Sequence, residues 1–496
     1  MHVHRCPAGC DGNCKVSRRS FLAASASLAA GLLSSCSAPQ GRDASAAASN
    51  SPVRPIRQKG PASRCTPAVK VCFVRRKGAY GMRWPGAYFD GEAALRNYTR
   101  DITATARDLA MKLDLRPQPL YTQAEADAWI AEADAAKPDG LIVVLLDRQE
   151  HAWPTADKAI ATGIPTVVVS PLGTSFTTNT AGPARKPGSF ICSTDEFGPV
   201  RYGMKMLQAG AKLRATRCLV IRGAGGPDSE IPHLGIRLRN LPADVFIEEY
   251  RKTPDTPEVF ALADDLRRQA RRQAGATRQD VINGIKSYVV ARTLLEREEA
   301  DAITMDCLGA LGRLKVSLPC IAWSKMNDDG IPAACEADLG AVATHCVTQY
   351  LFDRPGFQQD PVADTVREAV IGAHCSCPTR LGGFGGPSEP YDIIPHHGAR
   401  DATARPLWRV GQRVTMADVL LGSAKAPTQM VMAAGEVLDN ISVPPAGGCV
   451  VSVSIRFDGG KDVLTFPGFH QIFFYGDFKK ELLQFCHLFK IEAVLT

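Results

Sequence analysis

Runs of apolar residues alternate with amphipathic stretches along most of the chain. From Val69 the apolar runs are continuous, which is typical of parallel strands covered on both faces. Between them, Leu95, Ile102 and Leu109 recur at helical spacing within 92–113 and predict the first crossover helix. We expect the first strands of a parallel sheet at 69–74, 140–146 and 166–170.

The same alternation begins again near residue 218. An apolar strand at 218–221 leads to a helix at 281–298, and further strands are expected at 302–305 and 320–323. The pattern therefore predicts a second α/β unit with a parallel sheet.

After about residue 366 the chain changes to short β-like runs separated by Gly and Pro. Such runs lie at 429–432, 449–455 and 471–475, and a helix is expected at 479–488. The expected fold class is α/β, with two consecutive doubly wound parallel-sheet domains followed by a mainly β C-terminal domain. The boundaries predicted for the three domains are 66–212, 213–365 and 366–496.

The beginning of the chain differs from the rest. Arg18 and Arg19 precede an apolar run that reaches Leu33, which is too short to span a bilayer at about 20 residues per crossing. The paired arginines resemble a twin-arginine export signal, and the segment 33–36 resembles a lipobox, in which Cys36 is lipidated. We expect a signal at 1–36, a flexible linker at 37–65, and a periplasmic or cell-envelope lipoprotein that contacts the membrane through its lipid.

Composition and charge exclude some classes of protein. Hydrophobic residues make up 45% of the 496 residues, as in an ordinary globular protein. The net charge is +7, and three of these charges fall within the first 36 residues, so no basic surface for nucleic acid is expected. Twelve cysteines follow Cys36, most of them inside apolar runs where a thiol behaves as a small hydrophobe, and no disulfide pairing is predicted.

Two carboxylates are predicted to meet although they are distant in the chain. Glu336 is expected in the first turn of an amphipathic helix at 336–352, about 24 Å long. The eight residues that follow can return about 26 Å when extended, which brings Asp360 back beside Glu336; Asp364 is the alternative. With His374 and His470, such a pair would suit a hard divalent metal and proton transfer.

Three segments carry a family resemblance. The run PCIAWSKMNDDGIPAACEAD at 319–338, AHC at 373–375 and FHQIFFYGD at 469–477 resemble the L-fucose isomerase and L-arabinose isomerase superfamily. The resemblance implies that Glu336 and Asp360 are the acid/base pair and Mn²⁺ ligands. It also implies that His470 is a ligand and that His374 is a ligand or a substrate contact.

The function implied by the resemblance is aldose–ketose isomerisation of a pentose or deoxyhexose through a cis-enediol. We expect Mn²⁺ or another divalent metal as cofactor, a small-molecule sugar as substrate, and His374, Arg75 and Trp323 among its contacts. The family resemblance also implies a homo-oligomer, a trimer or hexamer. The alternatives are an exported sugar-binding lipoprotein, since α/β domains on a lipid tether also describe sugar receptors, and an isomerase fold without catalysis.

Overall fold

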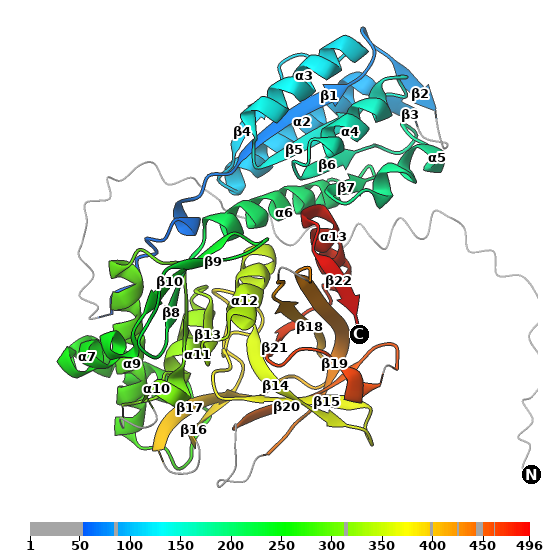
Figure 1. The fold of residues 1–496 in the computed structure, drawn as a ribbon. Helices are drawn as coiled ribbons and strands as arrows, with labels where there is room; N and C mark the ends of the chain where they lie inside the picture. Colours follow the sequence, from blue (N-terminus) through cyan, green and yellow to red (C-terminus); the bar gives the residue numbers. More distant parts are fainter. Residues whose placement is uncertain are drawn as a thin grey trace, which may run out of the picture. The chain divides into compact units, whose positions relative to one another are not determined.

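The computed structural model describes residues 53–83, 88–311, 316–396, 400–423, 426–442, 450–460 and 462–496 (Figure 1). It shows a mixed α/β protein with a parallel N-terminal sheet, a middle sheet and an antiparallel C-terminal sheet. The predicted export signal, Cys36 and the linker up to residue 52 lie outside the described residues. No helix among the described residues has the length and apolar character needed to cross a membrane.

The N-terminal sheet has the strand order β4-β1-β5-β6-β7, and all of its pairings are parallel. Strands β5 and β6 are buried along their whole length, as their continuous apolar runs predict. The strands are β1 (Ala68–Val74), β4 (Lys112–Leu115), β5 (Gly140–Leu145), β6 (Thr166–Val169) and β7 (Ser189–Cys192). The accompanying helices are α2 (Gly91–Asp108), α3 (Gln123–Ala136), α4 (Ala152–Ala161), α5 (Thr177–Thr180) and α6 (Gly198–Ala215). A small hairpin of β2 (Gly81–Arg83) and β3 (Tyr88–Asp90) precedes α2.

The first crossover helix is shorter than the apolar spacing predicted. Helix α2 ends at Asp108, and Ala110 adopts a positive φ of 49° before the chain enters β4. The helix was predicted to reach residue 113 because an apolar residue of the short edge strand β4 happens to fall at helical spacing from those of α2.

The middle sheet has the order β13-β12-β8-β10-β9, with all neighbours parallel except β9 and β10. Its strands are β8 (Arg217–Ile221), β9 (Ser229–Ile231), β10 (Ile236–Leu241), β12 (Ala302–Met305) and β13 (Ala333–Cys335). The helices are α7 (Ala243–Lys252), α8 (Pro257–Gln269), α9 (Arg278–Arg297), α10 (Cys307–Leu311), α11 (Cys320–Asp328) and α12 (Leu339–Phe352).

The strand predicted at 320–323 is wrong, because these residues form the first turn of α11. Eight of the nine residues of α11 are buried, so the helix has no polar face that would display a helical period. A short apolar run that is buried on all sides looks the same in a strand and in a helix.

The C-terminal sheet has the order β18-β21-β14-β15-β20-β19-β22, and pairing between β18 and β19 closes six of the strands into a ring. The strands are β14 (Phe357–Asp364), β15 (Ala369–His374), β18 (Arg413–Leu420), β19 (Gln429–Asn440), β20 (Val451–Phe457), β21 (Gln471–Tyr475) and β22 (Glu492–Leu495). All pairings are antiparallel except that of β22 with β19. Because β14 belongs to this sheet, the sheet begins at Phe357 and not after the boundary predicted at 365.

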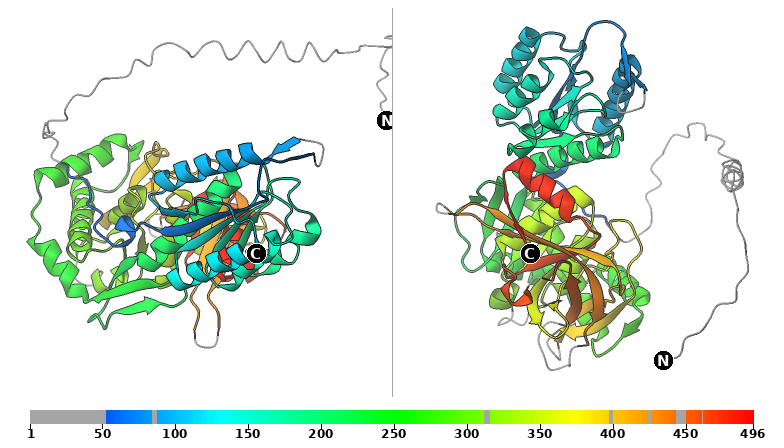
Figure 2. Two further views of the ribbon diagram at one scale, coloured as in Figure 1. Left: turned by 90° about the horizontal axis from the view of Figure 1, so that it is seen from above. Right: turned by 90° about the vertical axis from the view of Figure 1, so that its right-hand side faces the viewer.

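Two further elements connect the sheets. Helix α13 (Lys479–Phe489), red in Figures 1 and 2, packs against β7 of the N-terminal sheet and against β19 and β22. A separate small sheet joins β11 (Arg272–Gln273) to the hairpin β16 (Tyr391–His396) and β17 (Arg400–Pro406). Short 3₁₀ turns lie at Ala62–Arg64, Pro183–Arg185 and Val463–Thr465.

The described end of the predicted linker is not a free tether. The Arg54 backbone N–H donates to Glu258, and its guanidinium pairs with Glu296 at 2.6 Å. Further along, the backbone N–H groups of Ala62 and Ser63 donate to Asp301 at 3.1 Å. The flexible linker predicted for 37–65 is therefore wrong over 53–65, where polar contacts that composition does not reveal hold the chain against the middle unit.

Candidate active site

Glu336 lies at the carboxyl end of β13, in a bend of two residues. Glu336 and Ala337 have positive φ values of 63° and 53°, and Asp338 then caps α12 by accepting from the Ala341 N–H at 2.8 Å. The sequence predicted Glu336 in the first turn of this helix, and that prediction is wrong, because Glu336 lies three residues before the helix begins. Non-glycine residues in this conformation cost roughly 1 kcal/mol or more each, and such costs are common at functional sites. The carboxyl ends of parallel strands are also where α/β sheets place their ligands.

The register of the C-terminal sheet brings three more candidate residues together. In β14, Asp360 pairs with Ala373 of β15, the residue before His374. On the other side of β14, Gln359 pairs with Gln471 of β21, the residue after His470. Asp360 is thus next to both histidines, because its strand lies between theirs.

The same register places Asp364, the alternative, opposite Ala369 and away from the two histidines. It lies four residues further along β14, where its carboxylate accepts from the Val366 and Arg367 N–H groups in the hairpin turn. Its role is to hold the turn between β14 and β15.

The four side chains converge within contact distance. His374 Nε2 lies 3.8 Å from Glu336 Oε1, and His470 Nε2 lies 3.5 Å from Glu336 Oε2. His470 Nε2 is also 3.1 Å from Asp360 Oδ1. The imidazoles are buried, whereas the side chains of Glu336 and Asp360 are 31% and 32% exposed, so a small molecule can reach the carboxylates from solvent.

Asp338 also belongs to this group of side chains, although its sequence context did not indicate it. Its Oδ2 lies 2.8 Å from His470 Nδ1, while its Oδ1 caps α12. A carboxylate on Nδ1 keeps the proton there and turns Nε2 toward the other carboxylates. An Asp before a helix is ordinarily interpreted as a cap, which it is here as well, so no signal in the sequence revealed its second contact.

The electrostatics of the group favour a cation. Burial opposes the charged form of His470, but Asp338, Asp360 and Glu336 outweigh that effect and raise the pKa of His470 to about 10. Burial raises the pKa of Glu336, against the opposing effects of His374 and His470. Negative charge from three carboxylates is therefore concentrated around two imidazoles.

The donor set fits a divalent metal ion. Ligand atoms of Glu336, His374 and His470 all lie within 4.8 Å of one another. The Nε2 atoms of both histidines are buried and face carboxylate oxygens of Glu336, and that of His470 also faces Asp360. Mixed carboxylate and imidazole ligands suit first-row divalent ions such as Mn²⁺, whereas zinc more often takes additional His or Cys.

Arg75 and Trp323, the other two predicted sugar contacts, are not accessible to a sugar in the structure. Arg75, at the end of the N-terminal strand β1, is 2% exposed, and its guanidinium binds the Gly78 carbonyl and Glu92. Trp323 has no solvent-exposed surface in α11. Arg75 is used in polar contacts within the protein and Trp323 in core packing, and a sequence motif does not distinguish these roles from ligand contact.

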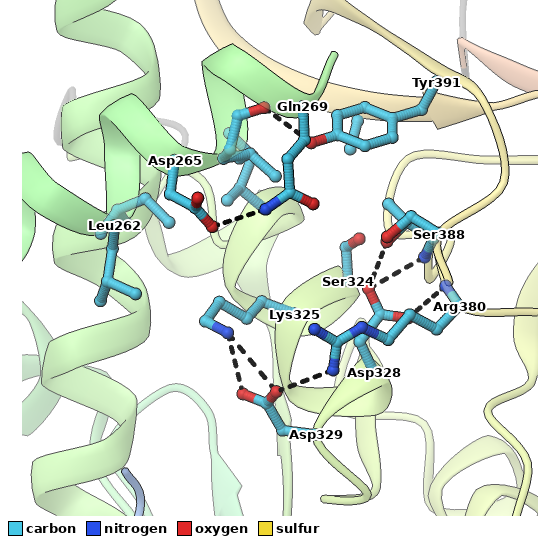
Figure 3. Close-up of a pocket in the computed structure, with 15 residues that line it drawn as sticks. Leu262, Asp265, Gln269, Ser324, Lys325, Asp328, Asp329, Arg380, Ser388 and Tyr391 are labelled. Atoms are coloured by element: carbon cyan, nitrogen blue, oxygen red, sulfur yellow. Dashed lines mark hydrogen bonds and ion pairs between the residues drawn. The ribbon is translucent and has the colours of Figure 1, made fainter. Parts of the chain in front are cut away.

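A cavity lies apart from these four residues. It has a volume of about 60 Å³ and lies between α8, α11 and the segment 379–391 (Figure 3). Asp328 in its wall accepts from the Thr379 hydroxyl at 2.7 Å and the Arg380 N–H at 2.7 Å, while Lys325 pairs with Asp329. Its charged groups hold the loop to the helix, and it shares no lining residue with the Glu336 group.

Comparison with protein-family models and with curated proteins finds no match to this chain. The resemblance to the sugar isomerases therefore stands on the motifs named above.

Proposed function

We propose that the protein is a metal-dependent aldose–ketose isomerase acting on a pentose or deoxyhexose. The observation that carries this proposal is the convergence of Glu336, Asp360, His374 and His470 at one partly open place. The proposal includes the division into two doubly wound α/β domains and a β-rich third domain. The site lies where the middle sheet meets the C-terminal sheet.

Glu336, Asp360, His374 and His470 would hold the metal ion. When bound, a divalent ion acts as a Lewis acid toward the oxygens of the sugar and so stabilises the negative charge that develops on them. Asp338 holds His470 in orientation through Nδ1.

The two carboxylates would move the proton. One carboxylate removes the proton from the carbon next to the carbonyl, and the electron pair forms the double bond of a cis-enediol. The same carboxylate returns the proton to the neighbouring carbon, while the other exchanges a proton between the two oxygens. The partial exposure of Glu336 and Asp360 is what lets a sugar approach them.

The direct test is turnover. We expect the Mn²⁺-loaded full chain to convert at least one member of a panel of aldoses, including L-fucose and L-arabinose, to its ketose. Glu336→Gln should lower kcat at least 1,000-fold, because the amide cannot accept the proton. Chromatography of the sugars before and after incubation measures both.

A matched control is Glu368→Gln, on the exposed turn between β14 and β15. It should leave kcat unchanged. Sugar binding in calorimetry without any turnover, or full activity in Glu336→Gln, would contradict the proposal; the first result would favour a sugar-binding protein or a catalytically inactive isomerase fold.

A further inference from the structure

Buried thiols gather directly behind the candidate active site. Cys320 is the first residue of α11, Cys335 the last of β13, and Cys375 follows the last residue of β15. His396 ends β16, and all four side chains are at most 6% exposed. They come from four separate elements, so the sequence shows no metal-binding spacing such as Cys-x-x-Cys.

The distances within this group are those of potential metal ligands. One ligand atom from each of Cys320, Cys375 and His396 lies within 4.8 Å of the others. In a tetrahedral zinc site with Zn–S bonds of about 2.3 Å, neighbouring ligand atoms are about 3.8 Å apart. Small side-chain movements would therefore close the three atoms around one ion.

A further thiol lies beside them. Ligand atoms of Cys335, Cys375 and His374 also lie within 4.8 Å of one another. Two or three thiols with one imidazole make a soft donor set, unlike the carboxylate-rich group at Glu336.

We propose that Cys320, Cys375 and His396 form a structural zinc site, with the Cys335 thiol nearby, that is distinct from the active-site metal. The site is closed to solvent, as expected of an ion that stabilises the fold and takes no part in substrate chemistry. The ion would tie α11 of the middle unit to β15 and β16.

Other buried cysteines in the chain serve as the contrast. Cys72 and Cys218 lie in apolar core clusters, as Cys320, Cys335 and Cys375 also do, but they belong to no group of potential metal ligands among the described residues. Packing as a small hydrophobe explains those residues. The group at Cys320 differs in that it places an imidazole, that of His396, beside two thiols.

The zinc site would also support the active site. Cys375 Sγ lies 3.5 Å from His374 Nδ1. A zinc-bound thiolate accepts the Nδ1 proton and leaves the Nε2 lone pair of His374 facing Glu336. Cys375 is in this respect a positioning residue.

Metal analysis tests the proposal. We expect the full chain, isolated under reducing conditions from zinc-supplemented cells, to contain about one zinc per chain that survives dialysis against a chelator. Cys320→Ser and His396→Gln should each lower the zinc content at least tenfold. Cys72→Ser, the matched buried thiol, should retain it, and so should Glu336→Gln, which separates this proposal from the isomerase proposal.

Several results would overturn it. These are a zinc content below one tenth per chain, unchanged zinc in both cluster variants, or loss of two titratable thiols to a disulfide in the isolated protein. If the variants do not fold, the absorption spectrum of the wild-type chain produced with Co²⁺ tests the proposed site instead. Strong thiolate-to-cobalt charge-transfer absorption is expected, and its absence would contradict the assignment.

Discussion

Asp338 uses its two carboxylate oxygens for different partners. Oδ1 accepts the Ala341 N–H at the start of α12, and Oδ2 lies 2.8 Å from Nδ1 of His470, which is 132 residues further along the chain and directly precedes β21. One side chain therefore sets both the beginning of the helix and the orientation of a proposed ligand.

Asp338→Asn separates these two tasks. Asn caps a helix about as well as Asp, so the melting temperature should change little. Its amide nitrogen, however, is a donor and cannot accept the Nδ1 proton of His470. We expect Mn²⁺ affinity, measured by calorimetry, to fall about 10- to 100-fold.

The control is Asp90→Asn, at the cap of α2 in the N-terminal unit, where Asp90 also accepts N–H groups of the first turn. It should change neither stability nor affinity. Wild-type affinity in Asp338→Asn would show that the Asp338–His470 contact does not tune the site.

At the scale of elements, α12 connects the middle sheet to the C-terminal ring. The Thr344 hydroxyl on this helix donates to the Gly340 carbonyl and accepts the Val419 N–H of β18 at 2.9 Å. Both groups are buried, so this bond satisfies a strand N–H that would otherwise be left without a partner in the interior. Gly340 allows the close approach, because a Cβ there would lie 2.6 Å from the Val419 carbonyl oxygen.

Thr344→Val should destabilise the protein. The substitution keeps the shape of the side chain but leaves the Val419 N–H unsatisfied, at a cost of about 1–3 kcal/mol. Urea denaturation followed by circular dichroism measures the change.

Thr348→Val provides a matched control one turn later. The Thr348 hydroxyl is equally buried but has no hydrogen-bond partner among the described residues, so its replacement should be neutral or stabilising. Equal losses of stability in the two variants would show that the Thr344 bond contributes nothing.

At the scale of the whole molecule, a short N-terminal segment is held against the middle unit. Glu258 accepts the Arg54 N–H and forms a double contact with the buried Arg292 at 2.8 and 2.7 Å. Arg292 also donates to the Arg54 carbonyl. The segment that precedes β1 is therefore part of the folded protein.

Glu258→Gln should release this segment. Removing one partner leaves the buried Arg292 charge uncompensated, which costs about 3–5 kcal/mol in other proteins. We expect a lower melting temperature and faster tryptic cleavage after Arg57 and Lys59.

Glu248→Gln is the control for this variant, since Glu248 makes an exposed pair with Lys252 on α7. Such pairs contribute about 1 kcal/mol or less. If the cleavage rates of Glu258→Gln and wild type agree, the contacts of Glu258 do not hold the segment.

Local sequence patterns were sufficient to predict those strands and helices whose intrinsic preference is the same as the structure they adopt in the folded protein. Strands β5, β12 and β21 and helix α13 lie within a residue or two of the predicted ranges, because continuous apolar runs and amphipathic spacing survive in any packing. Glu336 and Asp360 both lie near His470 Nε2, as the predicted return of the chain suggested, although the helix begins at Leu339 and not at Glu336. The roles assigned to these residues stay predictions.

Other features depend on partners that are remote in the chain. The helical state of 320–328, the bend at Glu336 and the contact of Asp338 with His470 are decided by what packs around each segment. The thiol group arises in the same way, since Cys320, Cys375 and His396 meet only after three elements have docked. The sequence determined which elements form and which side chains are available; the tertiary structure decided which side chains meet, because those contacts depend on strand register and helix docking rather than on local spacing.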